Sequence, residues 1–127
     1  MALRTSEDVV RARQSVRAKA VKAGFGIVDQ TKLVTAASEI ARNTVDYGGG
    51  GTLRIDMLRD GPRRGVQLSF CDNGPGIADI KRAMTDGYTT GGGLGLGLSG
   101  AKRLSNEFSI ESTPGKGTTV TLARWKL

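Results

Sequence analysis

The hydrophobic period changes at the glycine run of residues 48–51, and this change limits the fold more than any other feature of the sequence. Before the run, apolar residues recur every three or four positions, which is the spacing of a helix face. After it, they alternate with polar residues, as in a half-buried strand. Because helices come first and strands follow, we expect an α+β two-layer sandwich, with helices on one face of a mostly antiparallel, mixed sheet.

Two helices are expected before the glycine run. The first has an N-cap at Ser6 and a stop at Gly24, and the second has an N-cap at Asp29. Their buried stripes comprise Val9, Ala12, Val16 and Ala20 in the first helix and Leu33, Ala37, Ile40 and Ala41 in the second.

Four strands are expected, in two antiparallel hairpins. Residues 60–65 turn the chain in the first hairpin, and residues 113–117 turn it in the second. Between the hairpins we expect a short helix over about residues 77–84, a loop over 85–97 and a helix over 98–104. The alternating apolar residues are Leu53, Ile55 and Met57, then Val66, Leu68 and Phe70, then Phe108 and Ile110, and finally Val120 and Leu122.

The chain has 127 residues, and we expect residues 1–127 to form one domain with a single core. No apolar stretch approaches the roughly 20 residues that cross a bilayer. The first ten residues lack the apolar segment of a secretory signal. The expected location is therefore the cytoplasm, with no membrane partner.

Histidine is absent, and Cys71 is the single cysteine. These counts exclude an internal disulfide, a Ser-His-Asp or Cys-His catalytic group and a phosphohistidine on this chain, and they disfavour a structural zinc site.

The formal net charge is +7, which suits either solvated helix faces or a surface for nucleic acid or an acidic protein partner. We favour solvated faces, with the basic first helix as the best candidate for a partner surface. Aromatic residues make up only 5% of the chain, so base-stacking platforms are scarce and we expect no nucleic-acid partner.

Glu39 and Asn43 are four residues apart on the second expected helix, so they share one face beside its apolar stripe. Mg²⁺ prefers hard oxygen ligands and keeps several waters, so one asparagine oxygen together with phosphate oxygens suffices to bind it. Taken alone, the two residues are better explained as an ordinary exposed polar pair.

Asp72 follows the second strand and precedes Gly74 and Gly76. A carboxylate at a strand end can accept a hydrogen bond from the exocyclic amine of adenine, whereas guanine presents a carbonyl there. The two glycines would let a planar base approach the backbone. Taken alone, an Asp-Asn-Gly turn is the simpler explanation.

A glycine-rich run precedes the last expected helix and comprises Gly91, Gly92, Gly93, Leu94, Gly95, Leu96 and Gly97. Successive backbone N–H groups in such a run can cradle phosphates. A Rossmann-type loop should directly follow a strand, and a Walker A loop should end in Gly-Lys-Ser/Thr; this run does neither. Farther on, Thr118 and Thr119 could bond a nucleotide or simply suit a strand.

These four features occur in one order: Glu-x-x-x-Asn on a helix, Asp-x-Gly-x-Gly after a strand, a glycine-rich run, and Gly-Thr-Thr. Their order resembles that of the GHKL superfamily of ATP-binding proteins, which has the Bergerat fold. The resemblance covers nearly the whole chain and implies ATP and Mg²⁺ as cofactors.

Within the superfamily, gyrase-like and Hsp90-like proteins need further domains, and histidine kinases need a phospho-accepting histidine. The chain looks most similar to the anti-sigma-factor serine/threonine kinases, and among them to the RsbT-like switch kinases of the stressosome. The segments that carry this likeness are residues 24–26, 28–30, 38–43, 86–95 and 100–104.

The resemblance implies phosphorylation of a serine or threonine on a STAS-domain protein, and then binding of a downstream phosphatase or other signalling enzyme. It implies that Asn43 coordinates Mg²⁺, Asp72 selects adenine and Glu39 acts as general base, while the glycine-rich run wraps the phosphates. Candidates for a partner contact or for a cation near the γ-phosphate are Arg11, Arg13 and Lys102.

Two other functions stay open at this point. One is a non-catalytic, ATP-dependent anti-sigma factor or sequestering module, which would bind ATP without transferring phosphate. The other is a nucleic-acid-binding protein, which would bind DNA in a steeply salt-dependent way that ignores ATP.

Overall fold

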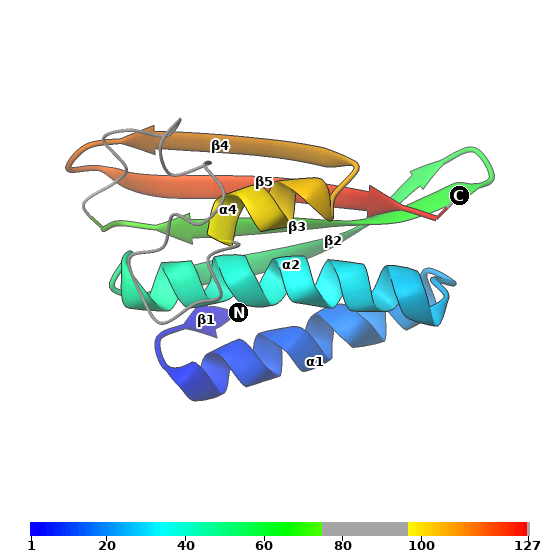
Figure 1. Ribbon diagram of the computed structural model, residues 1–127, viewed down its shortest axis with the longest axis horizontal. Coiled ribbons are helices and arrows are strands. Elements are labelled where there is room, and N and C mark those ends of the chain that lie inside the picture. Colours follow the sequence, from blue (N-terminus) through cyan, green and yellow to red (C-terminus); the bar gives the residue numbers. More distant parts are fainter. Residues whose placement is uncertain (75–96, 127) are drawn as a thin grey trace.

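The computed structural model describes residues 1–74 and 97–126. They form two layers, a five-stranded sheet and helices that cover one of its faces (Figure 1). The expected α+β two-layer sandwich is confirmed. In chain order, the elements are β1 (Ala2–Leu3), α1 (Ser6–Lys22), α2 (Ile27–Asp46), β2 (Gly51–Asp60), β3 (Arg63–Asp72), α4 (Gly97–Arg103), β4 (Glu107–Thr113) and β5 (Gly117–Trp125).

The strands follow the order β1-β2-β3-β5-β4, and every pairing among these strands is antiparallel. Both expected hairpins, β2–β3 and β4–β5, are present. Asp60 pairs with Arg63, so the first hairpin turns through Gly61 and Pro62 and is tighter than the six-residue turn expected. The two residues of β1 extend the sheet beyond β2.

The N-cap of α1 is Thr5 and not Ser6. The N–H of Asp8 donates to the hydroxyl of Thr5 at 3.4 Å, and the carboxylate of Asp8 accepts from the N–H of Thr5 at 3.2 Å. This reciprocal pair is a capping box. A further hydrogen bond from the N–H of Arg4 is the main cause that lowers the pKa of the Asp8 carboxyl.

The N-cap of α2 is Gly26 and not the predicted Asp29. Asp29 instead lies in the first helical turn and forms an ion pair with Arg124, with 2.6 Å between Oδ1 and Nη2. Arg124 also donates from Nη1 to the carbonyl oxygen of Leu104 at 2.8 Å. One arginine near the end of β5 thereby joins the start of α2 to the residue that follows α4.

None of the helices in the part of the chain that the structure describes has the length and apolar character of a membrane span.

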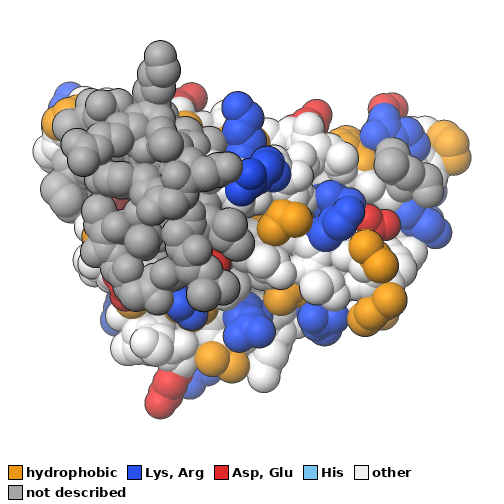
Figure 2. All heavy atoms as spheres, in the orientation of Figure 1, with side chains coloured by type: hydrophobic (Ala, Val, Ile, Leu, Met, Phe, Trp, Pro, Cys, Tyr) orange, Lys and Arg blue, Asp and Glu red, His pale blue; other side chains and the backbone are white. Residues whose placement is uncertain are grey.

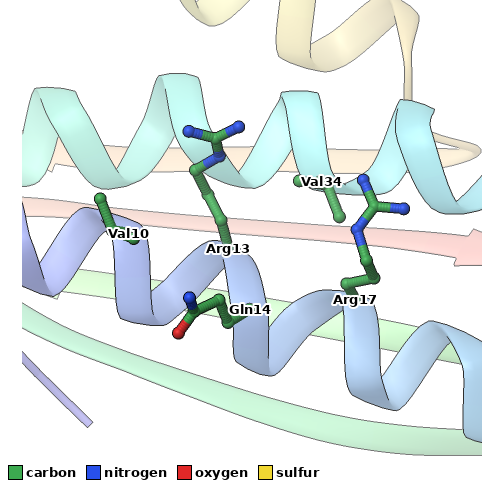
Figure 3. Close-up of a pocket in the computed structure, with 5 residues that line it drawn as sticks. All are labelled: Val10, Arg13, Gln14, Arg17 and Val34. Carbon is green, nitrogen blue, oxygen red and sulfur yellow. The ribbon is translucent and has the colours of Figure 1, made fainter.

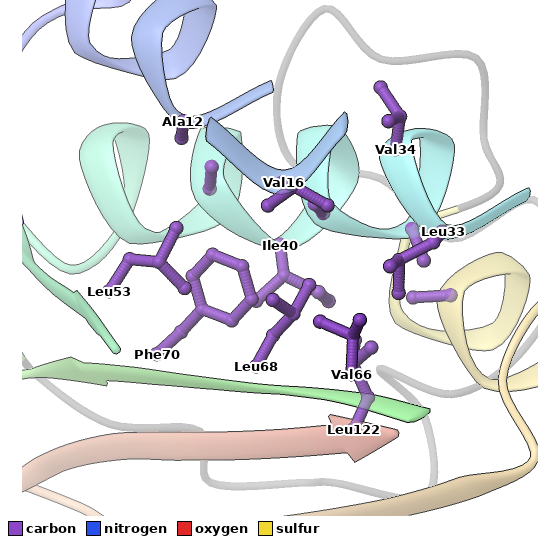
Figure 4. Close-up of a cluster of buried hydrophobic side chains, with 14 of the residues drawn as sticks. Ala12, Val16, Leu33, Val34, Ile40, Leu53, Val66, Leu68, Phe70 and Leu122 are labelled. Carbon is purple, nitrogen blue, oxygen red and sulfur yellow. The ribbon is translucent and has the colours of Figure 1, made fainter. Parts of the chain in front are cut away.

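The core lies between the sheet and the helices (Figure 4). Alternate residues of β3 and β5 face the helices, because side chains of a strand alternate between the two faces. Phe70 and Leu68 meet Ile40 of α2 there, and each of these side chains is at most 1% exposed. Every residue of the apolar stripes predicted for the two helices is buried.

The link between α2 and β2 is short and closely held. The N–H groups of Tyr47 and Gly48 both donate to the carbonyl oxygen of Asn43, at 2.9 and 3.2 Å. The N–H of Gly50 donates to the carbonyl oxygen of Thr44 at 2.9 Å. A Cβ on Gly51 would lie 2.8 Å from Cγ2 of Thr44, so β2 starts directly against the last turn of the helix.

Candidate functional site

Glu39 and Asn43 lie on the C-terminal half of α2, one helical turn apart. Both side chains are half-buried, because they border the stripe that contains the buried Ile40 and Thr44. The carbonyl oxygen of Asn43 accepts the two hydrogen bonds that end the helix, so its turn is firmly held. The expected common face of Glu39 and Asn43 is therefore present at the edge of the core.

Asp72 is the last residue of β3 and is half-buried. It lies two residues beyond Phe70, so its side chain points to the same, helix-covered face of the sheet. Its Oδ1 accepts a hydrogen bond from the N–H of Gly74 at 2.9 Å. A carboxylate has about four acceptor positions, so this bond leaves room for a further donor such as an exocyclic amine.

Gly48 brings the end of α2 against Asp72. A Cβ on Gly48 would lie 2.5 Å from Cγ of Asp72, which is closer than real Cβ contacts allow. A Cβ on Gly74 would lie 2.7 Å from Cα of Gly48, so residues 72–74 meet the segment after α2 without an intervening side chain. Gly117, with φ +103°, packs on the backbone of Asp72 from β5.

The sequence indicates Asp72 and Gly74 for this site and includes Gly117 in the Gly-Thr-Thr motif, but it does not indicate Gly48. Residues 48–51 predict only the end of a helix. The usable signal was that a run of four glycines is more than a helix stop requires.

Thr118 and Thr119 lie on opposite faces of the sheet. Thr118 pairs in register with Asp72 and shares its face, and its hydroxyl lies 2.9 Å from that of Ser112. Thr119 pairs with Cys71, and its Oγ1 lies 3.6 Å from the sulfur atom on the uncovered face. The structure thus brings the side chain of Thr118 to Asp72 and directs that of Thr119 away.

The candidate cations are spread over the molecule. Arg11 pairs with Asp8, with 2.7 Å between Nη1 and Oδ1. Arg13 lines a groove of about 240 Å³ between α1 and α2, and Asp72 is not among the residues that line it (Figure 3). Lys102 is exposed in the last turn of α4, which lies on the side of α2 opposite α1 (Figure 1). The groove is bordered by Val10, Arg13, Gln14, Arg17 and Val34.

Part of the predicted site lies outside the described residues. This part includes the expected short helix at about residues 77–84 and also Gly76, Gly91, Gly92, Gly93, Leu94, Gly95 and Leu96. Gly97 is described and is the first residue of α4, whose Leu98 and Ala101 are buried. Since α4 packs on α2, the glycine-rich run ends next to the helix that carries Glu39 and Asn43.

The donors present suit Mg²⁺, because Asn43 and Glu39 offer hard oxygen atoms on one helix face. In the described ranges 1–74 and 97–126, no three residues of the His, Cys, Asp and Glu types are grouped to hold a metal ion. A magnesium ion at Asn43 would take its remaining ligands from phosphate and water, and this assignment stays a prediction.

Comparison with known proteins identifies the family. Residues 28–127 match the family described as histidine kinase-, DNA gyrase B-, and HSP90-like ATPases. The chain belongs to this family. Membership confirms the GHKL superfamily expected from the order of the four motifs and implies that this ATPase-family protein uses ATP.

Two relatives indicate to which members of the ATPase family this chain is similar. It is 46% identical to the serine/threonine-protein kinase RsbT of Bacillus subtilis (strain 168), over 95% of this chain and 91% of that protein. It is 30% identical to the anti-sigma F factor of Thermoanaerobacter sp. (strain X514), over 97% of this chain and 89% of that protein. These similarities bear out the expected enzyme class, a protein serine/threonine kinase, and the likeness to RsbT-like and anti-sigma proteins.

Solved structures of other members share the fold. The mycobacterial sensor histidine kinase MprB superposes with a TM-score of 0.57 at 17% identity, over 98% of this chain and 95% of that one. The catalytic domain of histidine kinase ThkA gives a TM-score of 0.54 at 14% identity, over 98% and 93% of the two chains. At these identities, the likeness supports the fold alone.

Proposed function

We propose that this chain is an ATP-dependent serine/threonine protein kinase of a bacterial partner-switching pathway of the stressosome type. It phosphorylates a STAS-domain antagonist protein in the cytoplasm and is then free to bind a downstream phosphatase or other signalling enzyme. The observation that carries the proposal is the junction at Gly48, which packs the helix of Glu39 and Asn43 against Asp72. The likeness to a protein named serine/threonine-protein kinase supports it.

Nucleotide binding is assigned to four groups of this chain. Asp72 accepts a hydrogen bond from the exocyclic amine of adenine, and Gly74 and Gly76 leave space for the base. Thr118, beside Asp72 on the same face, is close enough in the sheet to contact the same ligand. Backbone N–H groups of the glycine-rich run surround the phosphates. Thr119 could contribute only through its backbone, because its side chain lies on the other face.

Asn43 would hold Mg²⁺, which neutralises charge on the phosphates when it is bound. Phosphoryl transfer depends mainly on positioning and electrostatics, so few protein groups are needed for the chemistry. Glu39 accepts the proton of the serine or threonine hydroxyl as the hydroxyl oxygen bonds to the γ-phosphorus. The bond from that phosphorus to the bridging oxygen breaks, and ADP leaves with the bonding electrons.

The test is transfer of label from γ-labelled ATP to a purified STAS-domain protein of the same pathway. We expect label on a serine or threonine of that protein, dependent on both Mg²⁺ and Glu39. ATP binding without any transfer would contradict the kinase proposal.

The alternative is a non-catalytic anti-sigma or sequestering module, and the likeness to anti-sigma F factors favours it as second candidate. It predicts a complex with a sigma factor that forms only with ATP and leaves no label on any partner. Titration of a sigma factor of the same pathway, with and without ATP, measures this directly.

A further inference from the structure

The three most exposed large hydrophobic side chains of the described residues all lie at one end of the helix layer. Val21 is 56% exposed in the last turn of α1, and Ile27 and Val28 are 68% and 63% exposed in the first turn of α2. The other exposed large hydrophobics are at most 49% exposed and lie elsewhere along the chain. We call Val21, Ile27 and Val28 the α1–α2 tip.

The α1–α2 tip is held in a fixed shape. The N–H of Gly24 donates to the carbonyl oxygen of Val21 at 2.9 Å, and that of Phe25 donates to Ala20 at 3.0 Å. The side chain of Phe25 is 4% exposed, and its carbonyl oxygen accepts a hydrogen bond from Nε2 of Gln30 at 2.8 Å. A surface that is ordered in advance loses little conformational entropy on binding, which favours affinity.

Positive charge surrounds the α1–α2 tip. Lys22 and Lys32 are exposed on either side of the turn, and Nζ of Lys126 lies 3.2 Å from where a Cβ of Gly24 would be. Asp29 is the single acidic residue between residues 9 and 38, and it is engaged by Arg124 at 2.6 Å. In Figure 2, hydrophobic side chains lie among Lys and Arg toward the end where α1 passes into α2.

The α1–α2 tip lies far from the proposed phosphate-transfer residues. Ile27 begins α2, and Glu39 and Asn43 lie 12 and 16 residues farther along it, so about 18 and 24 Å of helix separate them from Ile27 at roughly 1.5 Å per residue. A substrate whose hydroxyl must reach Glu39 does not need the tip. A partner that binds the kinase without being phosphorylated can use it while the nucleotide site is occupied.

We infer that the α1–α2 tip is the docking surface for a second, non-substrate protein partner that offers an aliphatic patch bordered by aspartate or glutamate. The inference rests on the proposed function, because it concerns the downstream signalling protein that the kinase binds after phosphate transfer. Aliphatic side chains at the centre with opposite charges at the rim match the usual anatomy of such interfaces. A second copy of this chain fits poorly, since it would bring lysines against lysines.

The experiment compares the wild-type chain with the double variant Ile27→Asp, Val28→Asp. Aspartate is favourable in the first turn of a helix, so the variant should fold. Met57→Asp is the matched control, because Met57 is also exposed, at 40%, but lies on β2. The purified downstream signalling protein is titrated with each chain, and phosphate transfer to the STAS-domain protein is measured in parallel.

We expect the tip variant to bind the downstream protein at least tenfold more weakly, with transfer to the STAS-domain protein within twofold of wild type. The control should change neither quantity. Unchanged binding of the downstream protein, or no binding of it even by the wild-type chain, overturns the inference. So does a parallel loss of phosphate transfer, which would assign the tip to substrate docking.

Two further outcomes would replace the proposed occupant. Binding of the wild-type chain, but not of the variant, to vesicles that contain phosphatidylserine would make the tip a membrane contact. Self-association that the variant loses would make it a contact between copies. Failure of the proposed function is separate, because it appears as absent phosphate transfer in the wild-type chain while the binding titration still reports on the tip.

Discussion

Glu39 is the residue on which the distinction between an ATP-binding module and a kinase depends. We predict that Glu39→Ala leaves ATP affinity unchanged and lowers phosphate transfer by about 100-fold or more, the usual contribution of a general base. Calorimetric titration with ATP and single-turnover transfer of label measure the two quantities. Asp46→Ala is the control, since Asp46 is exposed on the same helix. Equal loss of binding and transfer would mean that Glu39 supports the fold or the metal.

Asp72 can be tested without disturbing its turn. Asparagine keeps an oxygen that can accept the hydrogen bond from Gly74, but it loses the charge. Because hydrogen bonds to charged groups contribute roughly 1.5–3 kcal/mol, Asp72→Asn should weaken ATP binding by about 10- to 100-fold. Asp60→Asn, at the exposed end of β2, should have no effect. Unchanged ATP affinity in Asp72→Asn would remove the adenine assignment.

Gly48 offers a test of the packing that positions Asp72. It does not require a positive φ, so alanine is tolerated by the backbone, but its Cβ would overlap the side chain of Asp72. We predict that Gly48→Ala displaces the carboxylate and lowers ATP affinity by about tenfold, the loss of roughly 1.4 kcal/mol. Gly26→Ala is the matched control, because a Cβ there meets nothing within 4 Å. Equal affinities for the two variants would show that this contact is unimportant.

At the scale of the elements, Arg124 links three parts of the fold. Its ion pair with Asp29 joins β5 to α2, and its hydrogen bond to the carbonyl oxygen of Leu104 joins β5 to the residue after α4. The Arg124 side chain is only 12% exposed, so its loss leaves polar partners partly buried. We predict that Arg124→Met lowers the free energy of unfolding by about 2 kcal/mol. Urea denaturation measures this loss as a lower midpoint concentration, and the m-value should stay the same as that of the wild type.

Arg54→Met provides the comparison, since Arg54 pairs with Asp56 along one strand and its side chain is 79% exposed. Exposed pairs of this kind contribute about 0–1 kcal/mol. If both variants lose the same amount, the link through Arg124 has no special role in joining the elements.

Local sequence patterns predict the presence and type of the helices and strands better than the residues at which they begin and end. The alternation through Leu53, Leu68 and Ile110 is a property of each strand alone, so the strands of both hairpins could be predicted from sequence. The start of α2 could not, because Asp29 resembles an N-cap and its actual partner, Arg124, is 95 residues away. The same holds for the site: the spacing of Glu39 and Asn43 fixes their common face, whereas the contact of Gly48 with Asp72 depends on how α2 crosses the sheet.

For the molecule as a whole, the net charge of +7 fits either solvated helix faces or a surface that binds nucleic acid. The two interpretations predict different effects of salt on DNA binding. A nucleic-acid-binding protein would show DNA affinity that falls steeply with salt concentration and ignores ATP. The family membership favours ATP as the ligand that the folded chain recognises. A ligand that binds only the folded state raises its stability, so recognition of ATP should be visible in the unfolding of the entire chain.

At 100 times its dissociation constant, ATP should stabilise the folded chain by about 2.7 kcal/mol. For a chain of 127 residues that unfolds as one unit, this corresponds to a rise in Tm of roughly 10 °C. We predict this rise with Mg²⁺ and ATP in a thermal unfolding experiment, a much smaller one with GTP at the same concentration, and at most roughly half of it for Asp72→Asn with ATP, because binding 10- to 100-fold weaker leaves about 0.4–1.4 kcal/mol of stabilisation. Equal shifts with ATP and GTP would argue against base recognition by Asp72, since guanine presents a carbonyl where adenine presents an amine.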